Sequence, residues 1–225
     1  MEIIKPYVEL EFITPNALHL IEKAGRTCYK SEDKITQDSA AKFCKMIQTR
    51  DHMSVLEHAS ATFRIVCDRG VSHEIVRHRL ASYSQESTRY CCYSPDKKGM
   101  KFIQPSWISD EDLAKEINRK SGEGIAFGKE MAVHVWYVQC EIAESRYDCL
   151  VSECGCTPQQ ARAVLPNCLK TELVMTANFR EWLHFLELRT SPQAHPDMRW
   201  IAQAIQTILW GHYPQIFRKA SEENV

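Results

Sequence analysis

The order of the strand-like and helical segments is the feature that most constrains the fold. Residues 3–13, 61–67 and 169–177 have the composition and alternation of strands. Helical periodicity or helix-start signals mark residues 16–30, 37–50, 125–153, 178–189 and 197–210. Helices and strands do not alternate regularly, which disfavours a doubly wound parallel sheet. The sequence therefore predicts an α+β fold: a single compact domain over residues 1–225, with an antiparallel sheet and long helices.

Two local signals predict where helices begin. Thr14 and Pro15 fit the N-cap and the first turn of the helix over 16–30. Ser72 is placed to cap a short helix that runs into Arg77. The segment after Arg77 is then expected to be extended or turn-like, with Arg77 and Arg79 on one side and His78 on the other.

Composition excludes several classes of protein. The 225 residues are 44% hydrophobic and 25% charged, which is typical of a globular chain with a sizeable core. The formal charge of −1 argues against a nucleic-acid binder that relies on a basic field, so any anion must be held locally. No apolar run approaches the ~20 residues of a membrane span, and the N-terminus does not resemble a signal peptide, so we expect a cytoplasmic protein.

The ten cysteines are scattered through expected core elements, which favours reduced, buried thiols over a disulfide framework. The densest group is Cys149, Cys154 and Cys156. Because the chain has no C-x-x-C and no second Cys/His pair at ligand spacing, we expect no metal site. A zinc enzyme built on Cys154, Cys156 and a histidine remains a weaker alternative.

The segment from Arg77 to Tyr90, RHRLASYSQESTRY, gathers arginines, hydroxyl groups and tyrosines. No G-x-G-x-x-G is present, and the nearest candidate, at residues 122–128, has the wrong spacing and is expected to be a loop. Phosphates would therefore be bound by side chains, for which the planar, permanently charged guanidinium is suited. The segment is a candidate anion site. From spacing alone, a salt-bridged surface turn or an RNA-contact loop is an equally good interpretation.

Longer motifs separate these alternatives. Arg77-His78-Arg79 followed after seven residues by Ser87 resembles the R-H-R-x7-S signature of flavin-dependent thymidylate synthases. The upstream segment HMSVLEH at 52–58 is similar to the H-x-[ST]-x-x-E-H of that family, and the blocks at 161–166 and 178–189 resemble its later motifs in the same order. The resemblance covers residues of about 50 to 200.

Membership of that family implies an FAD-dependent methyltransferase that converts dUMP to dTMP. Methylenetetrahydrofolate would supply the one-carbon unit and NADPH the reducing equivalents, and reduced flavin would deliver a hydride without a covalent protein nucleophile. The resemblance also implies a homotetramer with FAD sites between subunits.

The family pattern also assigns residues to ligands. It implies that FAD is bound by Ser54, Arg77, His78, Arg79, Asn178, Arg180 and His184. It implies that dUMP is bound by Glu74, Arg77, Gln85, Glu86, Ser87, Thr88, Arg89, Arg162 and Arg189.

Individual roles can be weighed from the chemistry of each side chain. Arg189 is expected to be catalytic, because a fixed cation at the pyrimidine edge stabilises negative charge as the ring becomes nucleophilic. Glu74 stands where relatives often carry Gln, and its carboxylate would repel a phosphate unless an arginine pairs with it. Glu57 and His58 are expected to be a buried pair, and Tyr90 a packed aromatic.

Periodicity places Arg180 and His184 on a different helix face from an apolar stripe that includes Phe179 and Trp182. The main alternative to the enzyme is an RNA-binding module that uses the arginines and tyrosines of residues 77–90.

Overall fold

The computed structural model describes residues 1–94, 96–97 and 99–220. Contacts divide the chain into two compact units that are interleaved along the sequence. Unit 1 consists of Met1–Pro6, Val66–His73 and Gln85–Glu172, and unit 2 of Tyr7–Ile65, Glu74–Ser84 and Leu173–Val225. The expectation of one domain over the whole chain stays a prediction.

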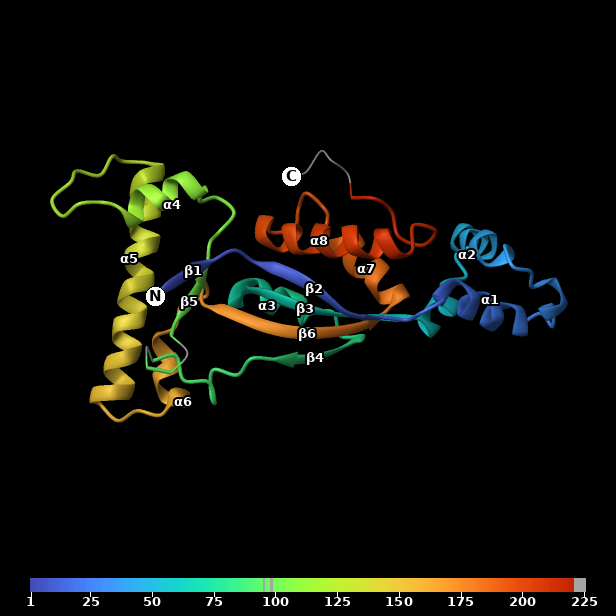
Figure 1. The fold of residues 1–225 in the computed structure, drawn as a ribbon, viewed down its shortest axis with the longest axis horizontal. Helices are drawn as coiled ribbons and strands as arrows, with labels where there is room; N and C mark the ends of the chain where they lie inside the picture. The colour runs from blue at the N-terminus through green and yellow to red at the C-terminus, as the bar shows by residue number, and fades with distance from the viewer. Residues whose placement is uncertain (95, 98, 221–225) are drawn as a thin grey trace. The chain divides into compact units, whose positions relative to one another are not determined.

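The larger sheet has four strands in the order β2 (Tyr7–Ile13), β3 (Ser60–Asp68), β6 (Lys170–Asn178) and β4 (Ala81–Gln85) (Figure 1). Backbone hydrogen bonds join the end of one strand to the start of the next: Thr14 N donates to Ser60 O (2.9 Å) and Phe179 N to Ala59 O (2.8 Å). Such pairing is antiparallel. The predicted α+β fold with an antiparallel sheet is therefore confirmed.

Unit 2 carries α1 (Ala17–Thr27), α2 (Ser39–Thr49), α7 (Phe179–Arg189) and α8 (Pro196–His212), with short 3-10 helices η1 (Glu32–Lys34) and η2 (Met53–His58). In Figure 1, α8 lies along β2, with α7 beside it, and α1 packs against α2. The core centres on fully buried Trp182, whose ring meets Phe63 edge-on at 5.1 Å and whose Nε1 donates to Ala61 O. Burying such an aromatic contributes about 2–3 kcal/mol.

Unit 1 has its own core and a second, smaller sheet. Strands β1 (Glu2–Ile4) and β5 (Lys101–Ile103) pair in parallel, which the sequence did not predict. Its helices are α4 (Asp110–Ile117), α5 (Lys129–Asp148), the π-helix η3 (Cys149–Glu153), α6 (Pro158–Ala161) and the 3-10 turn η4 (Arg162–Val164). Phe102, Cys140 and Tyr147 belong to a buried cluster that fixes α5 against the loops around β5.

Two of the expected helix caps are wrong. Asn16, in the left-handed region at φ 52°, precedes α1, while the Thr14 hydroxyl pairs with the backbone of Ser60 instead. Ser72 lies inside α3 (Arg69–Ile75), where its hydroxyl donates to Arg69 O; Asp68 Oδ1 accepts from Val71 N and caps the helix. In both cases the hydroxyl group hydrogen-bonds to another backbone group instead of the helix N-terminus that the sequence spacing suggested.

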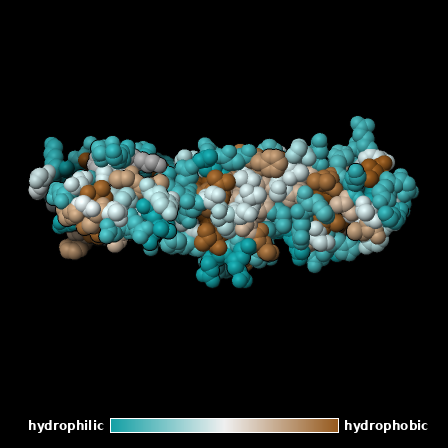
Figure 2. Space-filling view, turned by 90° about the horizontal axis from the view of Figure 1, so that it is seen from below, coloured by the Kyte–Doolittle hydropathy of each residue, from teal (hydrophilic) through white to brown (hydrophobic). Residues whose placement is uncertain are grey.

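All ten cysteines are free thiols, with Cys44, Cys67 and Cys140 buried. Within the described ranges, no His/Cys/Asp/Glu group has the arrangement of a metal site. No helix in this part of the chain is long and apolar enough to cross a membrane. The face shown in Figure 2 is mostly hydrophilic, and its apolar side chains form separate patches.

Candidate active site

The Arg-His-Arg segment follows the end of α3 and forms a turn. Arg77 N donates to Glu74 O (3.3 Å) and His78 N to Ile75 O (3.1 Å). The Tyr83 hydroxyl of β4 donates to the carbonyls of both His78 (2.7 Å) and Ile75 (3.0 Å), which fixes the turn on the sheet. His78 is buried, and Arg77 and Arg79 are exposed, so the predicted division of the three side chains is confirmed.

Arg189, at the C-terminal end of α7, is held on three nitrogens. Its Nη1 donates to the Glu74 carboxylate (2.8 Å), its Nη2 to the Glu74 carbonyl (3.1 Å), and its Nε to Nε2 of His78 (3.0 Å). Three of the five N–H groups of a guanidinium are thereby used, and two remain for a ligand. The arginine side chain is only 20% exposed, so its position is fixed by both hydrogen bonds and packing.

His78 is neutral in this arrangement. Because its Nε2 accepts from Arg189, the ring proton lies on Nδ1, which is 3.4 Å from a carboxylate oxygen of the buried Glu181. Burial and the charges of Arg189 and His184 lower the pKa of His78 from 6.5 to about 4. The nearby Glu181 would favour the charged ring, but desolvation and the guanidinium, which is already bonded to Nε2, outweigh it. The imidazole is thus a permanent acceptor for Arg189 near neutral pH.

The pairing of Glu74 with Arg189 answers the question raised by its charge. A free carboxylate here would repel an anion, but the ion pair with Arg189 neutralises the charge of Glu74. The Glu74 side chain is 34% exposed. Glu74 therefore acts in this structure as a support for Arg189.

The outward face of α7 carries further predicted residues. Phe179 and Trp182 are buried while Arg180 and His184 are exposed, which confirms the two predicted faces. Asn178 caps the helix, its Oδ1 accepting from Glu181 N (2.9 Å). Arg180 Nη1 forms an ion pair with Glu57 (2.6 Å).

The expectation of a buried Glu57–His58 pair is wrong, since both residues are exposed. η2 turns the two side chains outward and buries Leu56 in their place.

A pocket of about 950 Å³ opens in unit 2 over α1, α2 and η2. We call it the α1–α2 pocket. Ser54 and Arg180, both assigned to FAD by the family pattern, line it, and so does His52. Phe43, Met46 and Val55 add apolar surface. The pocket therefore offers both flat apolar area and polar groups to a large ligand.

Unit 1 carries the rest of the predicted dUMP residues. Gln85 donates to the hydroxyls of Ser72 (3.0 Å) and Thr171 (3.1 Å), Thr88 is buried, and Ser87 Oγ accepts from Arg89 N (3.3 Å). Arg89 Nε donates to Gln159 of α6 (2.9 Å).

Because Arg162 begins η4 directly after α6, the contact between Arg89 and Gln159 ties the serine- and arginine-bearing loop to the element that presents Arg162. Tyr90 is 77% exposed, with Arg89 over its ring, so the expectation of a packed aromatic is wrong.

Glu86 lies in a compact ionic network. Its carboxylate accepts from Lys170 Nζ (2.9 Å) and from the Tyr93 hydroxyl (3.2 Å), and Lys170 also contacts Glu172 (3.2 Å). Burial lowers the pKa of Lys170, but the hydrogen bonds and charges of Glu86 and Glu172 outweigh it and raise the pKa overall. Burial and Glu86 raise the pKa of Tyr93, so its hydroxyl stays a donor.

Sequence reasoning missed several supporting residues: Glu181, Tyr83, Lys170 and Tyr93. Glu181 reads as an ordinary acid in the first turn of a helix, where it would stabilise the dipole. A lysine at the start of a strand, a tyrosine in a strand and a tyrosine in a loop carry no distinctive spacing. Glu181 lies 103 positions from His78, and Lys170 lies 84 positions from Glu86, so local pattern could not reveal these contacts.

These features define a class: an α+β protein in which an arginine, held by a carboxylate and a neutral histidine, presents a fixed cation to an anionic ligand. The model of the family "Thymidylate synthase complementing protein" matches residues 9–215, which include parts of both units.

Curated relatives agree with the family model. The chain is 32% identical over 214 residues to a flavin-dependent thymidylate synthase of Geobacter sulfurreducens. The matched region covers 92% of this chain and 83% of the relative. It is 36% identical over 186 residues to the enzyme of that name from Mycobacterium tuberculosis. This match covers 81% of this chain and 71% of the relative.

Solved structures give the same result. Thymidylate Synthase X from Helicobacter pylori, with FAD and dUMP, has a TM-score of 0.73 at 25% identity and covers 95% of this chain and 97% of its own. A UMP/dUMP methylase, PolB, from Streptomyces cacaoi bound with 5-Br dUMP has a TM-score of 0.77 at 25% identity, covering 96% and 95%. The chain therefore belongs to the family of flavin-dependent thymidylate synthases, as its motifs implied.

Proposed function

We propose that this chain is an FAD-dependent methyltransferase that converts dUMP to dTMP, with methylenetetrahydrofolate as the one-carbon donor and NADPH as the reductant. The observation that carries the proposal is the fixed Arg189, bonded through three nitrogens and with two N–H groups left. Family membership supplies the reaction, and this geometry supplies a cation suited to it.

The residues assigned to FAD fit such a ligand. The side chains of Arg77 and Arg79 are exposed and form no ion pair within the described ranges, so both are available for phosphate oxygens. The α1–α2 pocket, with Ser54 and Arg180, has the volume and the mixed lining of a cofactor site. His184 lies on the same helix as Arg180, and Asn178 caps that helix.

When bound, the flavin supplies hydride transfer, and the chain's own residues bind and orient. His78 has a second role in this proposal: its neutral ring accepts from Arg189 and so helps to set the direction of the guanidinium.

We assign dUMP to the residues given by the family pattern: Glu74, Arg77, Gln85, Glu86, Ser87, Thr88, Arg89, Arg162 and Arg189. The arginines bind the phosphate and the pyrimidine edge, and the hydroxyls donate hydrogen bonds. Glu74 acts through Arg189, and Gln85 and Glu86 are held by their own partners, which makes them oriented acceptors.

Arg189 acts by electrostatic stabilisation. A guanidinium stays charged at any working pH, so it favours negative charge on the pyrimidine as the ring attacks through its fifth carbon. Because it is largely covered and held by three hydrogen bonds, it needs little reorganisation during the reaction. Removing one such donor typically costs about 3–4 kcal/mol of transition-state stabilisation.

A visible spectrum combined with a turnover assay tests the function. The purified protein should show flavin absorbance, oxidise NADPH faster when dUMP is present, and form dTMP only with methylenetetrahydrofolate. A colourless protein that neither takes up added FAD nor responds to dUMP would contradict the proposal. Binding of RNA by such a colourless protein, with a strong salt dependence, would favour the RNA-binding alternative.

A further inference from the structure

The α1–α2 pocket has more positive charge than its predicted flavin contacts require. Among the residues that the structure describes, five cationic side chains line it: Arg26, Lys34, Lys42, Arg50 and Arg180. In the same described part of the chain, Asp51 is the one acidic residue of that lining. Glu32, Asp33 and Asp38, which lie in the same stretch of chain as Lys34, do not line it.

Two of these cations already have partners. Arg26 Nε donates to Glu22 (2.7 Å) and Arg180 Nη1 to Glu57 (2.6 Å). Lys34, Lys42 and Arg50 are exposed, and none forms an ion pair within the ranges that the structure describes. With three unpaired cations against Asp51, the pocket has an excess of positive charge in a chain whose formal net charge is −1. Clustered cations of this kind attract anions and hold them locally.

The floor of the pocket is rigidly built. Glu22 is fully buried, and it binds both Arg26 and the Ser39 hydroxyl (2.8 Å), so α1 is fastened to the start of α2. The Arg26 guanidinium lies over the Phe43 ring at 5.1 Å. Phe43 in turn packs on Gly25, where a Cβ would come within 2.5 Å of the ring. A lining that combines an aromatic ring with several cations suits a ligand that combines a flat ring with anionic groups.

We propose that Lys34, Lys42 and Arg50 form a polyanion site that binds the phosphate or carboxylate groups of a co-substrate, next to the predicted flavin contacts Ser54 and Arg180. The shared chemistry has two sources in the proposed reaction: the phosphates of NADPH and the glutamate carboxylates of the folate. This inference rests on the proposed function and adds a ligand class for three cations to which the family pattern assigned no role.

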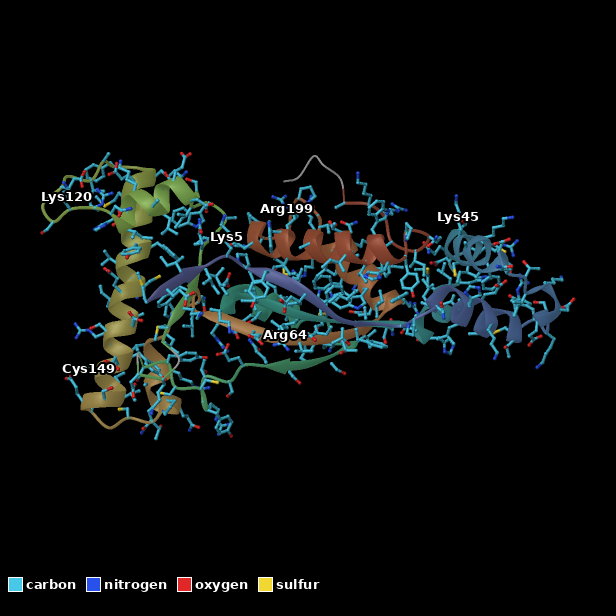
Figure 3. The ribbon with its side chains drawn as sticks, viewed as in Figure 1. Lys5, Lys45, Arg64, Lys120, Cys149 and Arg199 are labelled. Atoms are coloured by element: carbon cyan, nitrogen blue, oxygen red, sulfur yellow. The ribbon has the colours of Figure 1, made fainter. Side chains whose placement is uncertain are left out.

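The test compares two variants of the holoenzyme. In Lys42→Gln/Arg50→Gln, two of the proposed cations become neutral; Lys45→Gln is the matched control, because Lys45 is an exposed lysine on the same helix and does not line this pocket. In Figure 3, Lys45 projects from α2. Equilibrium dialysis at low salt measures the affinity for NADP⁺, NAD⁺, tetrahydrofolate monoglutamate and tetrahydrofolate triglutamate.

If the site binds phosphate, the double variant should bind NADP⁺ about tenfold more weakly, and the preference for NADP⁺ over NAD⁺ should fall. If the site binds carboxylates, the double variant should bind the triglutamate about tenfold more weakly. The higher affinity for the triglutamate than for the monoglutamate should then disappear. The control should keep wild-type affinities in both arms. Higher salt should reduce the affinity of the wild-type protein, because exposed charges are screened. The difference in affinity between the wild-type protein and the double variant should therefore become smaller.

Two results would overturn the inference. One is unchanged affinity for all four probes in the double variant. The other is a loss of bound flavin in that variant, which would assign the cations to FAD itself. Neither result would touch the proposed function, which fails only if the wild-type protein lacks flavin and dUMP-dependent turnover.

Discussion

At the scale of single residues, the site depends on charges that neutralise or orient one another. Glu74 and His78 hold Arg189, and Glu181 faces the proton that the neutral His78 carries. Breaking a buried, hydrogen-bonded charge network by removing one member leaves the others uncompensated and costs more than the net value of a single bond. Changes at Glu74, Glu181 or Arg189, which are not among the predicted flavin contacts, should therefore affect catalysis more than flavin binding.

Arg189→Ala should abolish dTMP formation while FAD stays bound. The variant removes the cation that stabilises the activated pyrimidine, and a loss of at least about 100-fold in kcat is expected. Arg189→Lys should recover little, because an ammonium cannot contact Glu74 and His78 in the same planar geometry. Turnover assays combined with the flavin absorbance of each variant measure both effects; normal turnover by Arg189→Ala would contradict the role.

Glu181→Gln should lower kcat about tenfold with little change in flavin content. The amide can donate to Nδ1 and shift the ring proton to Nε2, where it removes the acceptor that Arg189 uses. Glu181→Asp keeps the charge and should restore part of the rate. Steady-state kinetics on the two variants check this, and equal losses in both would instead indicate a purely steric role.

The stability of the protein should fall as the pH is lowered from about 6.5 to about 4, partly because of His78. The pKa in the folded state is about 4 and the unfolded value is about 6.5, so the unfolded chain takes up a proton first as the pH falls. The contribution of His78 to the free energy of unfolding is complete above pH 6.5 and is lost progressively as the pH falls toward 4. His78→Gln should flatten this part of the profile in denaturant unfolding at several pH values; an unchanged slope would contradict it.

At the scale of elements, the pocket depends on how closely α1 approaches α2. Gly25 permits the approach because Phe43 occupies the space that a Cβ would need. The spacing of apolar residues along α7 sets which side of the helix faces outward. The turn that carries Arg77 and Arg79 is positioned by the end of α3. Sequence patterns found most of these helices, because periodicity is local. They misplaced the caps of α1 and α3, because Thr14 and Ser72 have partners that only the packed chain supplies.

Gly25→Ala should destabilise the protein although it adds a better helix former. The gain in helix propensity is at most about 1 kcal/mol, whereas overpacking against Phe43 costs about 1–3 kcal/mol. Gly211→Ala is the control, because Gly211 lies in α8 with open space around it. Thermal unfolding should show a lower Tm for the first variant and an unchanged or higher Tm for the second; a higher Tm for Gly25→Ala would contradict the close packing.

At the scale of the whole molecule, the predicted ligand residues are distributed over both units. The FAD set lies in unit 2, and the dUMP set includes residues of each. We propose a homotetramer with FAD sites between subunits, which the family resemblance implies. The family match includes residues of both units, and the expectation of one domain stays a prediction.

If the subunits share the flavin site, dilution should release FAD together with dissociation. Analytical ultracentrifugation followed at a flavin wavelength and at a protein wavelength measures both on the same sample. The expected result is a concentration-dependent loss of flavin from the dissociated species. A monomer that retains full flavin occupancy would rule out the shared site.

The sequence by itself determined the chemistry of this protein: the arginine-rich signature, the family, the α+β class and the residue types that meet a flavin and a nucleotide. These follow from short-range patterns, since motif spacing and periodicity are properties of neighbouring residues. Only the tertiary structure decided which charges pair. Glu74 and Arg189 lie 115 positions apart, and whether that carboxylate repels a ligand or supports its arginine depends on a distance of 2.8 Å that packing alone sets. The unpaired cations of the α1–α2 pocket became visible in the same way, since a lysine is free or paired only in relation to the folded chain around it.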